Sequence, residues 1–144
     1  MSDRRAYALL ALRLSLGLLM LVWGSDKLVN PDHGVQVAET FYFGILSARA
    51  VMPVLGVLEV ILGLVVMAGV ARRYAYPILA AVTGVTLIGV WRSIVDPWGW
   101  MIEGGNALFF PSIIIFSAVL VLMAVGDDDQ LVLGRRKPVT VTRS

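Results

Sequence analysis

The chain reads RLSLGLLMLVWGSDK over residues 13–27, an apolar run that carries two basic side chains. Steps of three and four residues relate Arg13, Gly17, Met20, Gly24 and Lys27. Such spacing places side chains on one face of an α-helix. This stretch therefore predicts a helix whose glycines and basic residues share a face.

A second stretch repeats the pattern. Residues 56–63 read GVLEVILG, with Glu59 between Gly56 and Gly63 at helical spacing. Glycine allows two helix backbones to approach closely inside a membrane, where a charged group needs a partner. We therefore predict that the two helices pack through their glycines and that Arg13 pairs with Glu59 along a polar seam.

Two interpretations of this seam remain open. An Arg13–Glu59 ion pair could simply fix the register of the two helices. Alternatively, the same side chains could line a cavity for a quinone headgroup, a proton path or a polar substrate. Lys27, at the outer end of its helix, is expected to reach water by extending its side chain.

The amino-acid composition indicates whether the chain folds in water or in a lipid bilayer. Of the 144 residues, 58% are hydrophobic and 15% are charged, whereas soluble domains carry about a quarter charged residues. Four apolar runs are each close to the ~20 residues that a spanning helix needs. They cover about residues 7–23, 51–70, 74–91 and 107–125. We predict an all-α fold, an integral membrane four-helix bundle in contact with the lipid bilayer.

The segments between and after these runs complete the predicted organisation. A mixture of apolar or aromatic residues with polar ones indicates a short interfacial helix at about residues 35–45. The transmembrane domain is expected to cover residues 1–126, followed by a cytoplasmic tail over residues 127–144. The acidic triplet that opens this tail is expected to be solvated.

The distribution of basic residues predicts the orientation. With four spans, most arginines and lysines fall on one side, among them Arg4, Arg5, Arg72 and Arg73. The positive-inside rule then places both termini in the cytoplasm. The four tryptophans gather on the opposite side, as an interfacial aromatic belt would.

Several classes of chemistry are excluded by residue counts. The chain has no cysteine and one histidine, His33. It therefore has no thiol or iron–sulfur chemistry, and one chain cannot supply bis-histidine haem ligation or a zinc site of the usual ligand number. No metal site, covalently bound cofactor or nucleic-acid partner is expected, and no phosphate-binding loop or nucleophile triad is present.

Four further residues have two interpretations each. His33 is either a solvated loop residue or a proton relay or metal ligand. Asp26, beside Lys27, either balances the helix end or belongs to a site. Arg92 either anchors the interface or rims a pocket, and Asn106 either caps a helix or donates a hydrogen bond to a ligand.

The chain resembles the DoxX family of the wider DoxD/DoxX group. Three pieces carry the resemblance: Arg13 to Pro31 with its glycines and Lys27, the aromatic loop at residues 41–45, and residues 56–73 with Glu59. The resemblance implies a four-helix bundle in a bacterial or archaeal cytoplasmic membrane. It also implies that Arg13, Lys27 and Glu59 belong to a shared polar core.

The resemblance also implies a set of functions. DoxD-like relatives are linked to thiosulfate:quinone oxidoreduction, and DoxX-like relatives act as membrane subunits of oxidoreductase or oxidative-stress complexes. Because the chain has no redox centre of its own, we expect it not to be catalytic alone. The leading hypothesis is an accessory or quinone-associated subunit, with a soluble or membrane oxidoreductase partner or a homo-oligomer. The alternatives are a small proton-coupled transporter that uses Glu59 and a structural membrane anchor.

Overall fold

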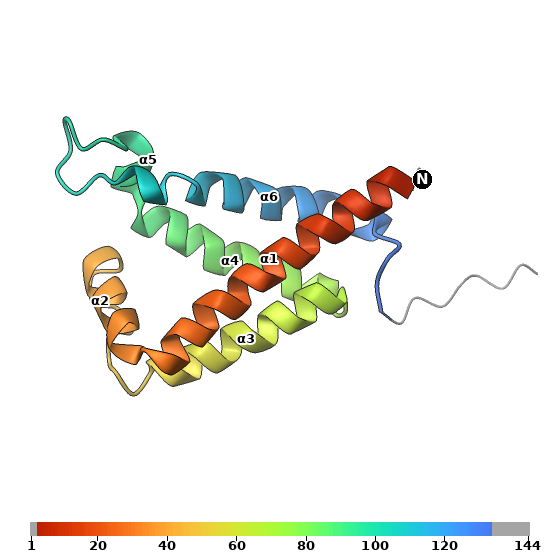
Figure 1. Ribbon diagram of the computed structural model, residues 1–144, viewed down its shortest axis with the longest axis horizontal. Helices are drawn as coiled ribbons and strands as arrows, with labels where there is room; N and C mark the ends of the chain where they lie inside the picture. The colour runs from red at the N-terminus through yellow and green to blue at the C-terminus, as the bar shows by residue number, and fades with distance from the viewer. Residues whose placement is uncertain (1–2, 134–144) are drawn as a thin grey trace, which may run out of the picture.

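The computed structural model describes residues 3–133, and every regular element within this range is helical (Figure 1). The α-helices are α1 (Asp3–Val29), α2 (Pro31–Phe41), α3 (Met52–Ala68), α4 (Arg72–Gly89), α5 (Trp91–Val95) and α6 (Ser112–Val125). Two 3₁₀ helices, η1 (Ala107–Phe109) and η2 (Gly126–Asp128), flank α6. The all-α prediction therefore holds for the described residues.

Helices α1 and α3 form the closest packed pair, and glycine makes the approach possible. A methyl group added at Gly24 would lie 2.6 Å from the carbonyl oxygen of Gly56, and one at Gly56 would lie 2.7 Å from that of Gly24. Gly17 and Gly63 face each other in the same way, at 2.7 and 2.6 Å. Backbones in such direct contact exclude any side chain, so all four predicted packing glycines lie at this interface.

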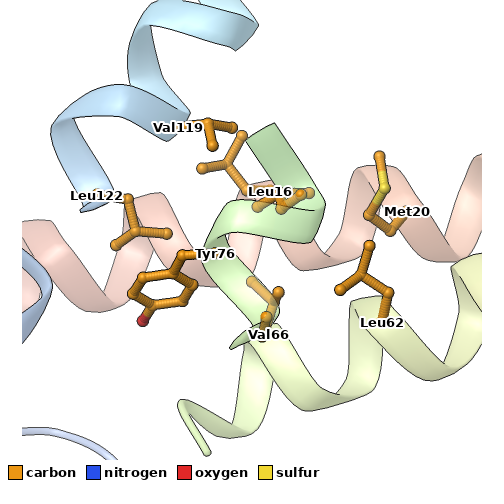
Figure 2. Close-up of a cluster of buried hydrophobic side chains, with 9 residues drawn as sticks. Leu16, Met20, Leu62, Val66, Tyr76, Val119 and Leu122 are labelled. Atoms are coloured by element: carbon orange, nitrogen blue, oxygen red, sulfur yellow. The ribbon is translucent and has the colours of Figure 1, made fainter. Parts of the chain in front are cut away.

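Helices α4 and α6 form a second pair, and the two pairs meet in one apolar core (Figure 2). The core consists of buried side chains from all four helices: Leu16, Met20, Leu62, Val66, Ala75, Tyr76, Leu79, Val119 and Leu122. From this core the pairs diverge toward the end of the molecule that carries α2 and α5 (Figure 1).

The helix boundaries follow local chemistry. Helix α1 extends beyond the predicted apolar run at both ends and stops before Pro31, which starts α2. Proline is tolerated in a first turn because the missing N–H would have no helical acceptor there. Gly69 ends α3 with φ of 70°, a left-handed conformation that glycine adopts without steric cost.

After α6 the chain turns back over the ends of α1, α3 and α4. We call residues 126–133 the C-terminal strap. Arg72 donates a hydrogen bond to the carbonyl oxygen of Gly126, Arg5 pairs with Asp128 at 2.5 Å, and the Leu133 amide donates to Ala68 at 3.0 Å. Both ends of the described chain therefore lie at the same end of the molecule (Figure 1).

The strap overturns one expectation about the acidic triplet. Asp129 is completely buried, so the prediction of a solvated triplet is wrong at this position. Its carboxylate is held by Arg13, which also is buried. The remainder of the predicted tail, residues 134–144, lies outside the described residues.

Two helical stretches within the described residues are long and apolar enough to cross a membrane. They are Arg4–Val29, with 26 residues, and Ala107–Asp128, with 22 residues. Met52–Ala68 is a shorter apolar helix. Large apolar side chains are more than half exposed on several helices, including Leu18, Val22, Leu58, Ile61 and Ile114. Large contiguous patches of exposed apolar side chains are rare on soluble monomers.

Candidate functional site

A cavity of about 1100 Å³ occupies the space where the two helix pairs diverge. Its wall comes from the last turns of α1, from α2 and the loop after it, from the first half of α3, from the end of α4, and from η1 and the start of α6. Most of the lining is apolar, and its charged or ionisable side chains Asp26, Lys27, His33 and Glu59 come from α1, α2 and α3. A site for an amphiphilic ligand has this composition.

The central polar feature of the wall is an ion pair between α1 and α3. The Lys27 ammonium lies 2.8 Å from one carboxylate oxygen of Glu59 and 3.0 Å from the other. Their side chains are 23% and 14% exposed, so the pair is shielded but still reaches the cavity. A charge pair in such a place is costly to desolvate and gains most of its stability from mutual contact.

The Arg13–Glu59 pair expected from the sequence does not form, and that prediction is wrong. The glycine contacts set the register, which places Glu59 opposite the neighbourhood of Leu21 on α1. This point is about 12 Å along the helix axis from Arg13 and about 9 Å from Lys27. Side chains also lean toward the N-terminus of their own helix, so Lys27 and Glu59 lean toward each other while Arg13 leans away.

A second acid–base pair lies at the rim of the cavity. His33 Nδ1 is 2.6 Å from a carboxylate oxygen of Asp26, and both side chains are about half exposed. The two residues also line the cavity. His33 thus lies in the first turn of α2 and not in a loop, and its half-exposed ring contacts Asp26.

Aromatic side chains close the cavity on the side of α2. The Phe41 and Phe109 rings meet edge to face with centroids 4.9 Å apart, and the Tyr42 hydroxyl donates to Thr86 at 3.3 Å. Burial raises the pKa of Tyr42, at the end of α2, above its ordinary value, so this hydroxyl keeps its proton and remains a donor. Trp23 adds a further ring to the wall.

Arg13 lies outside this cavity, at the other end of the molecule. Its guanidinium donates to the Asp129 carboxylate and to the Leu131 carbonyl oxygen, each at 2.6 Å. The two charged side chains are 2% and 0% exposed. Sequence reasoning missed this partner, although a buried arginine needed one and the apolar residues after the triplet could have indicated a packed segment.

Arg92 and Asn106 are also outside the cavity wall. Arg92 lies over the Trp91 ring, 5.8 Å from its centroid. Asn106 accepts a hydrogen bond from the Leu108 amide at 2.9 Å and thereby caps η1. The structure thus gives both residues local contacts in the segment between α4 and α6.

Asp96 organises the loop that follows α5, a role that the sequence did not indicate. Its carboxylate accepts hydrogen bonds from the amides of Met101 and Ile102 at 2.6 and 2.8 Å, and these bonds hold its pKa below the ordinary value. The folded loop therefore favours the ionised carboxylate of Asp96. This stabilisation is complete above the ordinary carboxyl pKa and is lost as pH falls through the lowered value.

We expect Asp96→Asn to loosen this loop at neutral pH. Hydrogen exchange at the Met101 and Ile102 amides should accelerate on the order of tenfold, because the charged acceptor is lost. Relative to the intrinsic exchange rate at each pH, the wild-type amides should lose the same protection only at acidic pH. Glu103→Gln in the same loop should leave their protection unchanged. Equal exchange in Asp96→Asn and wild type would contradict the assignment.

No cluster of three or more metal-ligating side chains occurs within residues 3–133. The cavity instead offers an ammonium donor, a carboxylate acceptor, hydroxyls and aromatic rings. This set is suited to a neutral ring that carries carbonyl or hydroxyl oxygens, because such groups can bond to Lys27 and Glu59 without adding charge.

Comparison with known proteins gives one family. The sequence profile of DoxX matches residues 8–92, which is more than half of the chain. The chain belongs to the DoxX family. The match covers most of α1 and all of α2, α3 and α4, and it includes the ion pair of Lys27 and Glu59. Neither a curated protein nor a solved structure gives a significant match. Together with its apolar helices, the match makes this chain a DoxX family membrane protein.

Proposed function

We propose that this DoxX family protein is a multi-pass protein of a bacterial or archaeal cytoplasmic membrane. In this proposal α1, α3, α4 and the stretch from η1 to η2 cross the bilayer, and the exposed apolar side chains face lipid. The described ends lie together, and the basic residues near them favour the cytoplasmic side.

The cavity is proposed to bind the ring of a quinone, and the Lys27–Glu59 pair within it is the observation that carries this proposal. A quinone carbonyl can accept a hydrogen bond from the Lys27 ammonium, and a quinol hydroxyl can donate to Glu59. Aromatic side chains such as Trp23 and Phe109 can stack on the ring. The volume accommodates a ring and part of an isoprenoid tail.

The biochemical role that fits such a site is an accessory or quinone-associated subunit of a membrane oxidoreductase or oxidative-stress complex. Binding of quinone by the bundle would place the ring beside a partner that carries the redox centre. The protein itself supplies binding, orientation and shielding from water. A soluble or membrane oxidoreductase partner is part of this proposal.

Native mass spectrometry of the gently solubilised protein tests the proposed role as a quinone-associated subunit. We expect the wild type to retain quinone, an oxidoreductase partner or both. The double variant Lys27→Met/Glu59→Leu, which removes both charges together, should lose at least about tenfold in quinone occupancy, because each charge-assisted hydrogen bond contributes about 1.5–3 kcal/mol. Arg49→Gln, in the exposed pair with Asp32, is the matched control and should behave as wild type.

Two other outcomes decide against this role. A wild-type protein that carries neither quinone nor partner overturns it. Uptake of a polar substrate into proteoliposomes, driven by a proton gradient and abolished in Glu59→Gln, would instead indicate a small proton-coupled transporter.

A further inference from the structure

The two acid–base pairs of the cavity lie side by side. Asp26 and Lys27 are consecutive residues of α1, and their partners come from different helices, His33 from α2 and Glu59 from α3. The first turn of α2 packs directly on Lys27, because a methyl group added at Gly34 would lie 3.5 Å from the Lys27 Cγ atom. The wall therefore contains four titratable groups in one contiguous cluster.

Exposure increases across this cluster from the cavity toward water. Glu59 and Lys27 are 14% and 23% exposed, whereas Asp26 and His33 are 42% and 52% exposed. The other charged neighbours are Asp32, on α2, and Arg49, which pair with each other at 2.8 Å and do not line the cavity. Tyr42 also lines the cavity and interacts electrostatically with Glu59. The outer pair thus lies nearer to the aqueous surface than the inner pair.

Binding of a quinone carbonyl to Lys27 would change the charge balance of the inner pair. The ammonium would direct a hydrogen to the carbonyl oxygen, and the Glu59 carboxylate would lose part of its contact with the cation. A mostly shielded carboxylate that shares its cation with a ligand is less well compensated, and uptake of a proton removes this cost. Histidine exchanges protons near neutral pH, and His33 is the exposed titratable side chain beside the pair.

We propose that this cavity couples ligand binding to proton uptake, with Glu59 as the group that takes the proton and the Asp26–His33 pair as its entry point from water. One proton carried by the His33 ring passes to a carboxylate oxygen of Glu59, and His33 regains a proton from water. No electron moves in this step. The inference rests on the quinone-type ligand proposed above.

Calorimetric titration with decylubiquinone in two buffers measures how many protons the protein takes up on binding. If binding takes up protons, the measured heat differs between phosphate and Tris because their ionisation enthalpies differ. We expect uptake of about one proton per bound quinone in the wild type at neutral pH and almost none in Glu59→Gln. Asp32→Asn, which removes a neighbouring carboxylate outside the cavity wall, should match the wild type.

Stopped-flow mixing with a pH indicator tests the route. His33→Gln should slow proton uptake at least about tenfold while the final extent per bound quinone stays the same, because a positioned acid–base group accelerates proton transfer without changing its equilibrium. Quinone binding without proton uptake, or an unchanged rate in His33→Gln, overturns this inference alone. Absence of binding by the wild type overturns the quinone assignment and this inference with it.

Discussion

Replacement of Arg13 by methionine is expected to destabilise the protein by about 3–5 kcal/mol, because it removes the guanidinium from its buried ion pair with the Asp129 carboxylate. The contact is 2.6 Å long and both side chains are almost completely buried. The loss can be measured as a shift in the unfolding midpoint in mixed micelles. Limited proteolysis should at the same time detect release of the C-terminal strap.

Two comparison variants separate a broken ion pair from a general packing defect. The double variant Arg13→Met/Asp129→Leu removes both charges and should recover most of the lost stability, since apolar replacements of a buried pair are often neutral. Arg5→Gln disrupts the exposed Arg5–Asp128 pair and should cost at most about 1 kcal/mol. The pairing would be contradicted if the stability losses of Arg13→Met and Asp129→Leu, measured singly, simply added in the double variant.

Replacement of Gly24 by leucine is expected to separate α1 from α3. Even a methyl group at this position would meet the Gly56 carbonyl oxygen and the Val60 side chain at less than 3 Å. Overpacking of this kind costs about 1–3 kcal/mol for small additions. The greater helix propensity of leucine, worth about 1 kcal/mol over glycine, cannot compensate for displacement of a backbone.

The expected readout is a large loss of folded yield together with loss of the Lys27–Glu59 contact, which depends on the same interface. A cysteine pair introduced at Leu21 and Val60 and tested by crosslinking would report the separation directly. Ala11→Leu adds a comparable side chain to the exposed face of the same helix and should leave crosslinking intact. Normal crosslinking in Gly24→Leu would show that the interface tolerates a side chain.

Much of the fold could be predicted because hydropathy and glycine spacing are local properties. The apolar runs indicated the long helices, and the glycines of residues 13–27 and 56–63 indicated the faces that pack. The boundaries were less accurate since α1 continues through polar residues as far as Val29, where Pro31 and not the end of the apolar run determines the stop. Helix α2 lies four residues earlier than the predicted interfacial helix for the same reason.

The candidate site was predicted in part. The polar residues of the first two spans were recognised, but Glu59 was matched to the wrong cation because its depth was counted from uncertain helix ends. The glycine spacing was a better guide, because Gly17 and Gly24 are as far apart as Gly56 and Gly63. When the two sets are matched in antiparallel order, Lys27 is favoured as the partner of Glu59. Asp129 could not be recognised from glycine spacing, because its burial depends on a chain reversal; the apolar residues after the triplet could indicate a packed segment but not its partner.

The contact between Arg13 and Asp129 joins residues 116 positions apart. If α1 crosses the bilayer as proposed, Arg13 enters the membrane when α1 is made, whereas Asp129 leaves the ribosome only after all the helices that the structure describes. Until then the arginine must be accommodated by lipid headgroups, water or the insertion machinery. A nascent chain interrupted before Asp129 therefore retains the glycine-packed helices but exposes a charge that quality-control proteases can recognise.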